Sequence, residues 1–211
     1  MPPAPPTAAL DDVLAYWFGD LSDDRPIPEG DVHLRRWWSH DPAIDADIAA
    51  RFGALVETAA TAFAAGWRPE TPAEALATVI LLDQLPRNIG RGTPAMYAHD
   101  GLAVAASRHA LGLADPLTGD LLRAVFVFMP LMHSEDLADQ EEMVGRFEAL
   151  VAEAERRASP GLAAFRSNLD FAHRHRDVVA RFGRFPHRNA ILGRVSTAEE
   201  EAFLTEPGSA F

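Results

Sequence analysis

The fold class is decided by residues 71–88, TPAEALATVILLDQLPRN. Thr71 stands directly before Pro72, and proline is tolerated at the first position of a helix because its missing N–H has no partner there. Glu74 follows Thr71 at the spacing of a capping box. Apolar residues then continue to Leu85. We therefore predict a helix over residues 72–85.

Similar start signals recur along the chain. Asp41, Thr93 and Ser159 each precede a proline, and Thr197 with Glu200 repeats the capping-box spacing. Two long segments carry apolar residues at helical spacing, whereas strand-like runs and hairpin turn signals are missing. We predict helices near residues 9–18, 31–38, 42–65, 72–85, 100–112, 119–130, 135–157, 160–182 and 197–204.

These helices predict an all-α protein of about nine helices. The connections between them are short, so successive helices should pack as antiparallel pairs. The pairs 42–85, 100–130 and 135–182 could stack as a solenoid, although their lengths match no fixed repeat period. The helix that contains residues 121–129 is apolar nearly all round except for Arg123, which predicts the most enclosed position. We predict a disordered, proline-rich leader over residues 1–8 and a single domain over residues 9–211.

Composition excludes several functions. The 31 acidic residues outnumber the 19 basic ones and give a net charge of −12, which repels nucleic-acid phosphates and anionic lipids. Lysine is absent, which excludes a Schiff-base lysine and a Walker-type phosphate lysine. Cysteine is also absent, which excludes thiolate chemistry and suits a cytoplasmic protein. We expect no nucleic-acid or membrane partner and no cofactor; the sequence leaves the oligomeric state open.

Basic residues are concentrated near the C-terminus. Residues 173–194 hold six arginines, three histidines and one acid, Asp177. Gly183 should end the preceding helix, so that residues 184–194 form a loop. Two interpretations of this loop stay open. Arg184 and Arg188 could clamp an external anion, or they could form a structural clasp with helix-end carbonyls and Asp83.

The helix over 160–182 should leave two of these basic residues, His173 and Arg176, at least partly buried. Taking Leu169 as the centre of its apolar face, the helical period turns His173 and Arg176 inward. The same period turns Arg174 and His175 away from the core. Because an unpaired buried guanidinium is costly, Arg176 should then have an anionic partner.

A polar cluster ends the helix over 72–85. Asp83, Gln84, Arg87 and Asn88 surround Pro86, which should end or kink the helix. Asp83 and Arg87 could form an ion pair, with the two amides satisfying carbonyls that the break frees. Alternatively, the break could aim these side chains at a ligand.

A second polar segment, residues 133–136, follows the most enclosed helix. Ser134 should be the N-cap of the next helix, where Glu135 and Asp136 complement the positive helix end. His133 is either a packing residue or an acid/base group. Asp83 and Glu135 are the best internal partners for the arginines.

Several short phrases are distinctive in combination. They are WFG (17–19), WW (37–38), LDQ (82–84), PRN (86–88), RGT (91–93), HSE (133–135), Gln140, RFGRFPHRN (181–189), GR (193–194) and ST (196–197). Through them the chain, from about residue 11 onward, resembles the bacterial family catalogued as domain of unknown function 924. The resemblance implies a tetratricopeptide-like α-helical superhelix and no established activity. Leu85 and Gly90 stand where that family more usually has phenylalanine.

The first functional hypothesis is a site for a small anionic molecule, with acid/base catalysis. Arg184 and Arg188 would clamp the anion, while a histidine moves a proton with help from a carboxylate. The candidate catalytic residues are His133, Glu135 and His187. The candidate ligand-binding residues are Asp83, Gln84, Arg87, Asn88, His173, Arg176, Arg184, Arg188 and Asn189.

Two other hypotheses compete with it. A tetratricopeptide-like module would bind a peptide or partner protein in an open groove lined by aromatic residues such as Trp37 and Trp38. Alternatively, His133, Glu135, His173 and His187 could hold a metal. We predict no metal, because no pair of ligands shares one helix at metal-binding spacing and neighbouring arginines would repel a dication.

Overall fold

The computed structural model describes residues 2–209, which form helices and no strands. The elements are α1 (Thr7–Phe18), α2 (Val32–Trp38), α3 (Pro42–Ala64), α4 (Pro72–Val79), the π-helix η1 (Ile80–Gln84), α5 (Leu85–Ile89), the 3₁₀ turn η2 (Pro94–Tyr97), α6 (Asp100–Leu113), η3 (Pro116–Thr118), α7 (Leu121–His133), α8 (Leu137–Arg156), α9 (Leu162–Phe182), η4 (Pro186–Arg188) and α10 (Ala198–Leu204). If the continuous run α4–η1–α5 is counted once, the described residues contain nine helices. The all-α prediction is confirmed.

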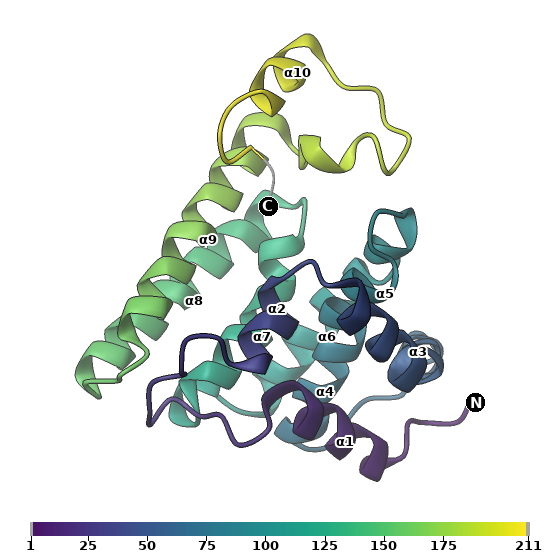
Figure 1. The fold of residues 1–211 in the computed structure, drawn as a ribbon, viewed down its shortest axis with the longest axis vertical. Coiled ribbons are helices and arrows are strands. Elements are labelled where there is room, and N and C mark those ends of the chain that lie inside the picture. Colours follow the sequence, from purple (N-terminus) through teal and green to yellow (C-terminus); the bar gives the residue numbers. More distant parts are fainter. Residues whose placement is uncertain (1, 210–211) are drawn as a thin grey trace.

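Helices that follow one another in sequence lie side by side (Figure 1). α6 packs on α7, α7 on α8 and α8 on α9, while α3 contacts α5 and α4 contacts α6. This arrangement agrees with the predicted stack of helix pairs. α10 and the loop before it lie at the opposite end of the molecule from α1 (Figure 1). None of the helices described is long and apolar enough to cross a membrane.

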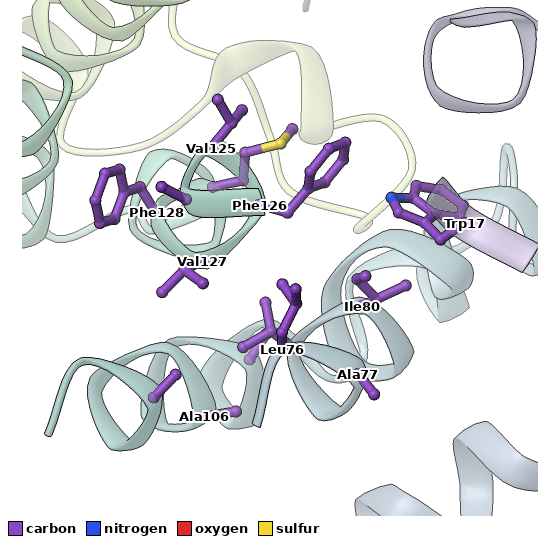
Figure 2. Packing of buried hydrophobic residues seen from close by; sticks show 14 of the residues in the cluster. Trp17, Leu76, Ala77, Ile80, Ala106, Val125, Phe126, Val127 and Phe128 are labelled. Atoms are coloured by element: carbon purple, nitrogen blue, oxygen red, sulfur yellow. The ribbon is translucent and has the colours of Figure 1, made fainter. Parts of the chain in front are cut away.

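The core is built around α7, as predicted. Side chains from all sides of this helix are buried, and Figure 2 shows the rings of Phe126 and Phe128 on opposite sides of it. Phe126 meets the ring of Trp17 on α1 edge-on at 5.8 Å. Phe128 meets Phe147 on α8 edge-on at 5.8 Å. Such contacts on several faces hold the end of α7, and therefore His133, in a fixed position.

The helix predicted to end or kink at Pro86 instead continues to Ile89. The N–H of Leu85 bonds to the carbonyl of Ile80, five residues back, at the end of η1. This wider π-turn shifts the carbonyls out of α register directly before Pro86, which lacks an N–H of its own. The helix therefore continues beyond Pro86 without a break. All five residues of η1, including Asp83 and Gln84, are buried.

Two other helix starts differ from the prediction. The N-cap of α8 is Asp136, whose carboxylate accepts from the N–H of Ala138, so the helix begins at Leu137. Ser134 instead accepts from the N–H of Asp136, which leaves Glu135 in the connection before the helix. α1 begins at Thr7, within the predicted leader. The division into a leader over 1–8 and a domain over 9–211 stays a prediction, and residues 1 and 210–211 lie outside the described residues.

The predicted orientation of α9 is wrong for His175, whereas Arg174 is exposed as predicted. His175, which was expected to point away from the core, is buried with 6% of its surface exposed, and His173 and Arg176 are partly buried as predicted. The buried face follows Phe165, Ala172, His175 and Val179 rather than the line through Leu169. Leu169 lies at the edge of that face. A prediction centred on Leu169 therefore places the buried face of α9 too far round the helix axis, on the side away from His175.

Gly90 fits a tight approach between α5 and η2. A Cβ atom at this position would lie 2.5 Å from the backbone nitrogen of Met96 and 2.8 Å from the carbonyl carbon of Ala95. A phenylalanine here would require η2 to move. This chain therefore has a local backbone arrangement that suits glycine beside Arg91.

Candidate functional site

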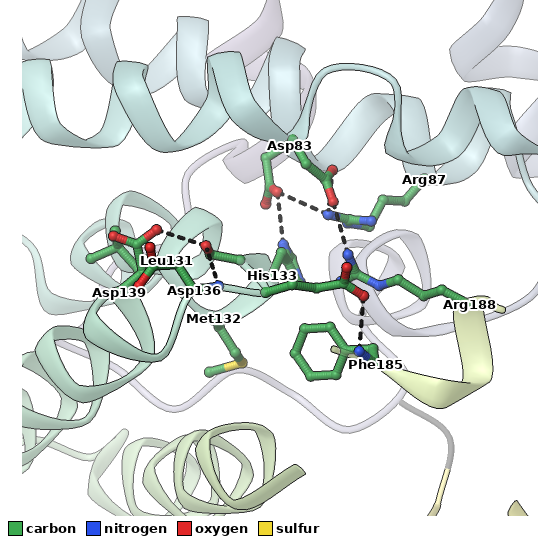
Figure 3. Close-up of polar contacts among 12 residues, drawn as sticks. Asp83, Arg87, Leu131, Met132, His133, Asp136, Asp139, Phe185 and Arg188 are labelled. Carbon is green, nitrogen blue, oxygen red and sulfur yellow. Dashed lines mark hydrogen bonds and ion pairs between the residues drawn. The ribbon is translucent and has the colours of Figure 1, made fainter. Parts of the chain in front are cut away.

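The candidate site lies where η1, the end of α7 and the loop after α9 meet. The carboxylate of Asp83 is fully buried and accepts three polar contacts. His133 Nδ1 lies 2.7 Å from Oδ1, Arg87 Nη2 lies 3.3 Å from Oδ1, and Gln84 Nε2 lies 2.5 Å from Oδ2. Figure 3 shows His133 and Arg87 converging on this carboxylate. The predicted Asp83–Arg87 ion pair is confirmed, and Gln84 binds the carboxylate rather than a freed carbonyl.

The charges of this cluster set the tautomer of His133. Burial would raise the pKa of Asp83, but His133 and Arg87 together hold it below its usual value. Burial and the nearby Arg87 lower the pKa of His133, against the opposing effect of Asp83. A neutral ring beside an ionised carboxylate keeps its proton on Nδ1, where it donates to Asp83. Nε2 is then the unprotonated nitrogen, and it makes no hydrogen bond with any described residue.

A second carboxylate, Asp100 at the start of α6, joins two arginines. Arg87 Nη2 lies 2.8 Å from Oδ1, and Arg188 Nη1 lies 3.1 Å from Oδ2. Arg188 is buried, with 7% of its side chain exposed. Its Nε and that of Arg87 have no hydrogen-bond partner among the residues described. One shared carboxylate therefore serves two buried guanidinium groups.

Among the described residues, Asp100 is the one carboxylate that pairs with Arg188, and it also pairs with Arg87. Burial and the neighbouring Arg87 lower the pKa of Arg188, although Asp100 opposes this change. Burial likewise raises the pKa of Asp100, despite Arg87. A further hydrogen-bond acceptor would stabilise the charged form of this buried guanidinium group.

The other arginines of the loop form a clasp. Arg184 makes two contacts with Glu200, at 2.6 and 2.7 Å. Arg194 makes two contacts with Glu135, at 2.6 and 2.9 Å, and Glu135 also accepts from the N–H of Phe185 at 2.8 Å. These pairs tie the loop to α10 and to the connection between α7 and α8. The clasp interpretation is supported, but with partners that differ from those predicted, since Asp83 bonds to none of the loop arginines.

Asn189 and His187 have different surroundings within the loop. Asn189 is buried and donates to Ser196 at 3.1 Å, while its oxygen accepts from Arg194 at 2.9 Å. It is therefore part of the clasp. Burial and the adjacent Arg188 lower the pKa of His187 to about 4, so this ring is neutral at pH 7.

Three predicted site residues lie elsewhere. Arg176 pairs with its neighbour Asp177 at 2.7 Å on the outside of α9, and His173 lies one turn before it. Asn88 donates to Asp45 of α3 at 2.9 Å, in a separate cluster. The helical period was applied to α9 from the wrong centre, and Asn88 points away from Asp83 because α5 continues beyond Pro86.

Comparison with known proteins places this arrangement in a family. The model of the family described as bacterial protein of unknown function (DUF924) matches residues 13–208. The chain belongs to this family. A solved structure described as a protein of unknown function, ATU0120 from Agrobacterium tumefaciens, is 34% identical, with a TM-score of 0.74 over 94% of this chain and 98% of that one. No match was found among the curated proteins. Membership in the tetratricopeptide-like superfamily stays a prediction.

Sequence reasoning missed four residues that shape this DUF924 site. Glu200 was seen only as a capping-box residue, and Arg194 only as part of the loop. Asp100 gives no local signal, since an acid at a helix start is ordinary. His175 was assigned to the wrong face of its helix. No group of three or more histidines, aspartates or glutamates within residues 2–209 is arranged to hold a metal ion.

Proposed function

We propose that this DUF924 protein binds a small anionic molecule beside Arg188 and that His133 moves a proton to or from it. The observation that carries the proposal is the 2.7 Å contact between His133 Nδ1 and the buried carboxylate of Asp83. This contact orients the ring and directs Nε2 away from Asp83. Within the described residues, Nε2 is left free of hydrogen bonds.

The dyad has the properties of a general base. Asp83 holds the proton on Nδ1, and its charge stabilises the imidazolium that forms when Nε2 takes up a second proton. The lowered pKa of His133 keeps the ring neutral and ready to accept at pH 7. The side chain is still 13% exposed, so a small molecule can approach it. Glu135, also predicted as a catalytic residue, pairs with Arg194 at 2.6 Å.

The anion would be held by Arg188. Of the two predicted clamp residues, Arg184 is paired with Glu200, and the candidate ligand-binding residue Asn189 also donates to Glu200. Arg188 is the buried loop arginine that shares its carboxylate with another arginine and keeps an unbonded Nε. A bound carboxylate or phosphate would supply the missing acceptor. The π-turn at η1 supports a functional role, since such turns recur at functional sites.

The experiment measures binding of acetate, citrate and inorganic phosphate by calorimetry. The wild-type protein should bind at least one of them, and Arg188→Gln should lose that binding. His133→Gln should retain it, because the proposed role of His133 is proton transfer. Arg181→Gln, which removes an exposed arginine paired with Glu199, is the matched control. If no probe binds, or if Arg188→Gln binds as well as the wild type, the proposal is wrong.

The alternative of a peptide-binding module has less support. Trp37 packs against Phe126 at 5.1 Å and donates its indole N–H to the carbonyl of Trp17 at 3.0 Å, as expected of a core anchor. Trp38 alone of this pair is exposed, at 53%. We also propose a cytoplasmic location and no nucleic-acid partner, on the absence of cysteine and the net charge of −12.

A further inference from the structure

A second pocket lies away from the His133 site, between α1, α2 and α3. Its volume is about 420 Å³, and each of the three helices contributes residues three or four positions apart. These helices lie away from α10 and the loop before it (Figure 1). The lining residues are Asp12, Ala15, Tyr16, His33, Arg36, Asp47 and Arg51.

Two arginines of this pocket lack carboxylate partners. Arg36 and Arg51 form no ion pair with any described residue, in a chain where most arginines do so. Both guanidinium groups instead lie against the ring of Tyr16, with Cζ atoms 3.7 and 4.5 Å from its centroid. Arg36 donates to the carbonyl of Tyr16, and its Nε is buried without an acceptor in the described part of the chain. Their positive charge is therefore available to a ligand.

Arg51 lies one helical turn after a carboxylate, that of Asp47, but does not pair with it. Asp47 precedes Arg51 by one turn of α3, which is the favourable order for a helical ion pair. Asp47 instead accepts a hydrogen bond from the hydroxyl of Tyr16 at 2.8 Å. Tyr16 thus keeps the acid and the two arginines apart on the pocket wall. Positive and negative groups remain separated, rather than neutralising each other.

Negative charge lines the same pocket. Asp12 is exposed and forms no ion pair within residues 2–209, and Asp47 has one oxygen that no hydrogen bond uses. A simple anion would be attracted by the arginines but repelled by these carboxylates. A molecule that carries both charges is complementary to both sets. We propose that this pocket binds a small zwitterion of the free amino-acid class, with its carboxylate on Arg36 and Arg51 and its ammonium group on Asp12 and Asp47.

Calorimetry with L-alanine, L-glutamine and L-phenylalanine tests this proposal. Propionate and ethylamine serve as probes that each lack one of the two charges. At least one amino acid should bind saturably, and in Arg188→Gln, which lacks the proposed anion site, neither single-charge probe should match it. Arg51→Gln and Asp12→Asn should each weaken amino-acid binding at least tenfold. Both residues are exposed, so these variants should fold.

The controls separate this site from the one at His133. Arg166→Gln changes an exposed arginine on α9, outside the pocket, and should bind as the wild type does. Arg188→Gln, which should abolish anion binding at the His133 site, should also leave amino-acid binding unchanged. The proposal is overturned if no amino acid binds, if propionate binds Arg188→Gln as tightly as L-alanine does, or if Arg51→Gln binds L-alanine normally. Each of these results can occur whether or not the His133 site binds an anion.

Discussion

Replacing Asp83 by asparagine is the sharpest test of the buried network. The substitution keeps the shape of the side chain but removes its charge and one acceptor oxygen. His133 Nδ1, Arg87 Nη2 and Gln84 Nε2 all contact this carboxylate. The amide NH₂ of the variant would face at least one of these donors. The ring of His133 would then have to change tautomer or turn.

The magnitude follows from the burial of the group. Breaking a buried ion pair by removing one partner costs about 3–5 kcal/mol, because the other charge stays buried without compensation. Arg87 keeps its contact with Asp100 at 2.8 Å, which favours the lower end of that range. For a chain of this size, each kcal/mol lowers the melting temperature by about 2–4 °C. We expect Asp83→Asn to melt about 6–20 °C below the wild type.

The pH dependence gives an independent check. The folded-state pKa of Asp83 is held below its unfolded value of 3.8. Its stabilising contribution is therefore present above about pH 4 and is lost as the pH falls further. The difference in unfolding free energy between wild type and Asp83→Asn should narrow below that pH.

Urea unfolding followed by circular dichroism at pH 7 and in acid measures both effects. Asp170→Asn, an exposed aspartate on α9, is the control and should change stability by less than about 0.5 kcal/mol. A loss below about 1 kcal/mol for Asp83→Asn at pH 7 would show that the carboxylate is not the centre of a buried ionic network.

Three further predictions concern other parts of the fold. Burial lowers the pKa of His175 to about 3, so its contribution to the free energy of unfolding is present above pH 6.5 and is lost as the pH falls. In urea titrations, the free energy of unfolding of the wild type should fall between pH 6.5 and pH 4. In His175→Gln that fall should be smaller by up to about 3 kcal/mol. Gly90→Ala places a Cβ atom 2.5 Å from the nitrogen of Met96; it should lower the melting temperature, and an unchanged value would mean that η2 moves freely. Glu135→Gln removes the charge that holds Arg194 at 2.6 Å; limited proteolysis should then cut residues 183–197 faster, with stability elsewhere little changed.

Helix signals in the sequence predicted most of the fold correctly. The capping box at Thr71 and Glu74, and the one at Thr197 and Glu200, are both formed. Gly183 ends α9 in the left-handed conformation, with φ 68°. These signals succeed because caps and turns depend on a few neighbouring residues. The helix end or kink predicted at Pro86 does not form, because proline's local preference is overridden by a π-turn that forms within the packed core.

The candidate site was predicted only in part. The spacing of Asp83 and Arg87 predicts their ion pair, whereas His133 follows a buried helix with no local partner, and the three side chains do meet. Which carboxylate pairs with which arginine was not predictable, because Asp100 and Arg188 lie 88 residues apart in sequence. Such pairing depends on the packing of α6 against the C-terminal loop rather than on local spacing.

In the arginine-rich loop, local sequence sets the charge, whereas tertiary structure sets the pairing of each arginine. Its sequence alone determined that positive charge gathers at the end of α9 in an acidic chain, since charge and helix termination are properties of neighbouring residues. Tertiary structure decided that Arg184 and Arg194 are neutralised by Glu200 and Glu135, while Arg188 shares Asp100 with Arg87. The reason is physical: the cost of a buried charge depends on every group packed around it, and these groups come from helices far apart in the chain.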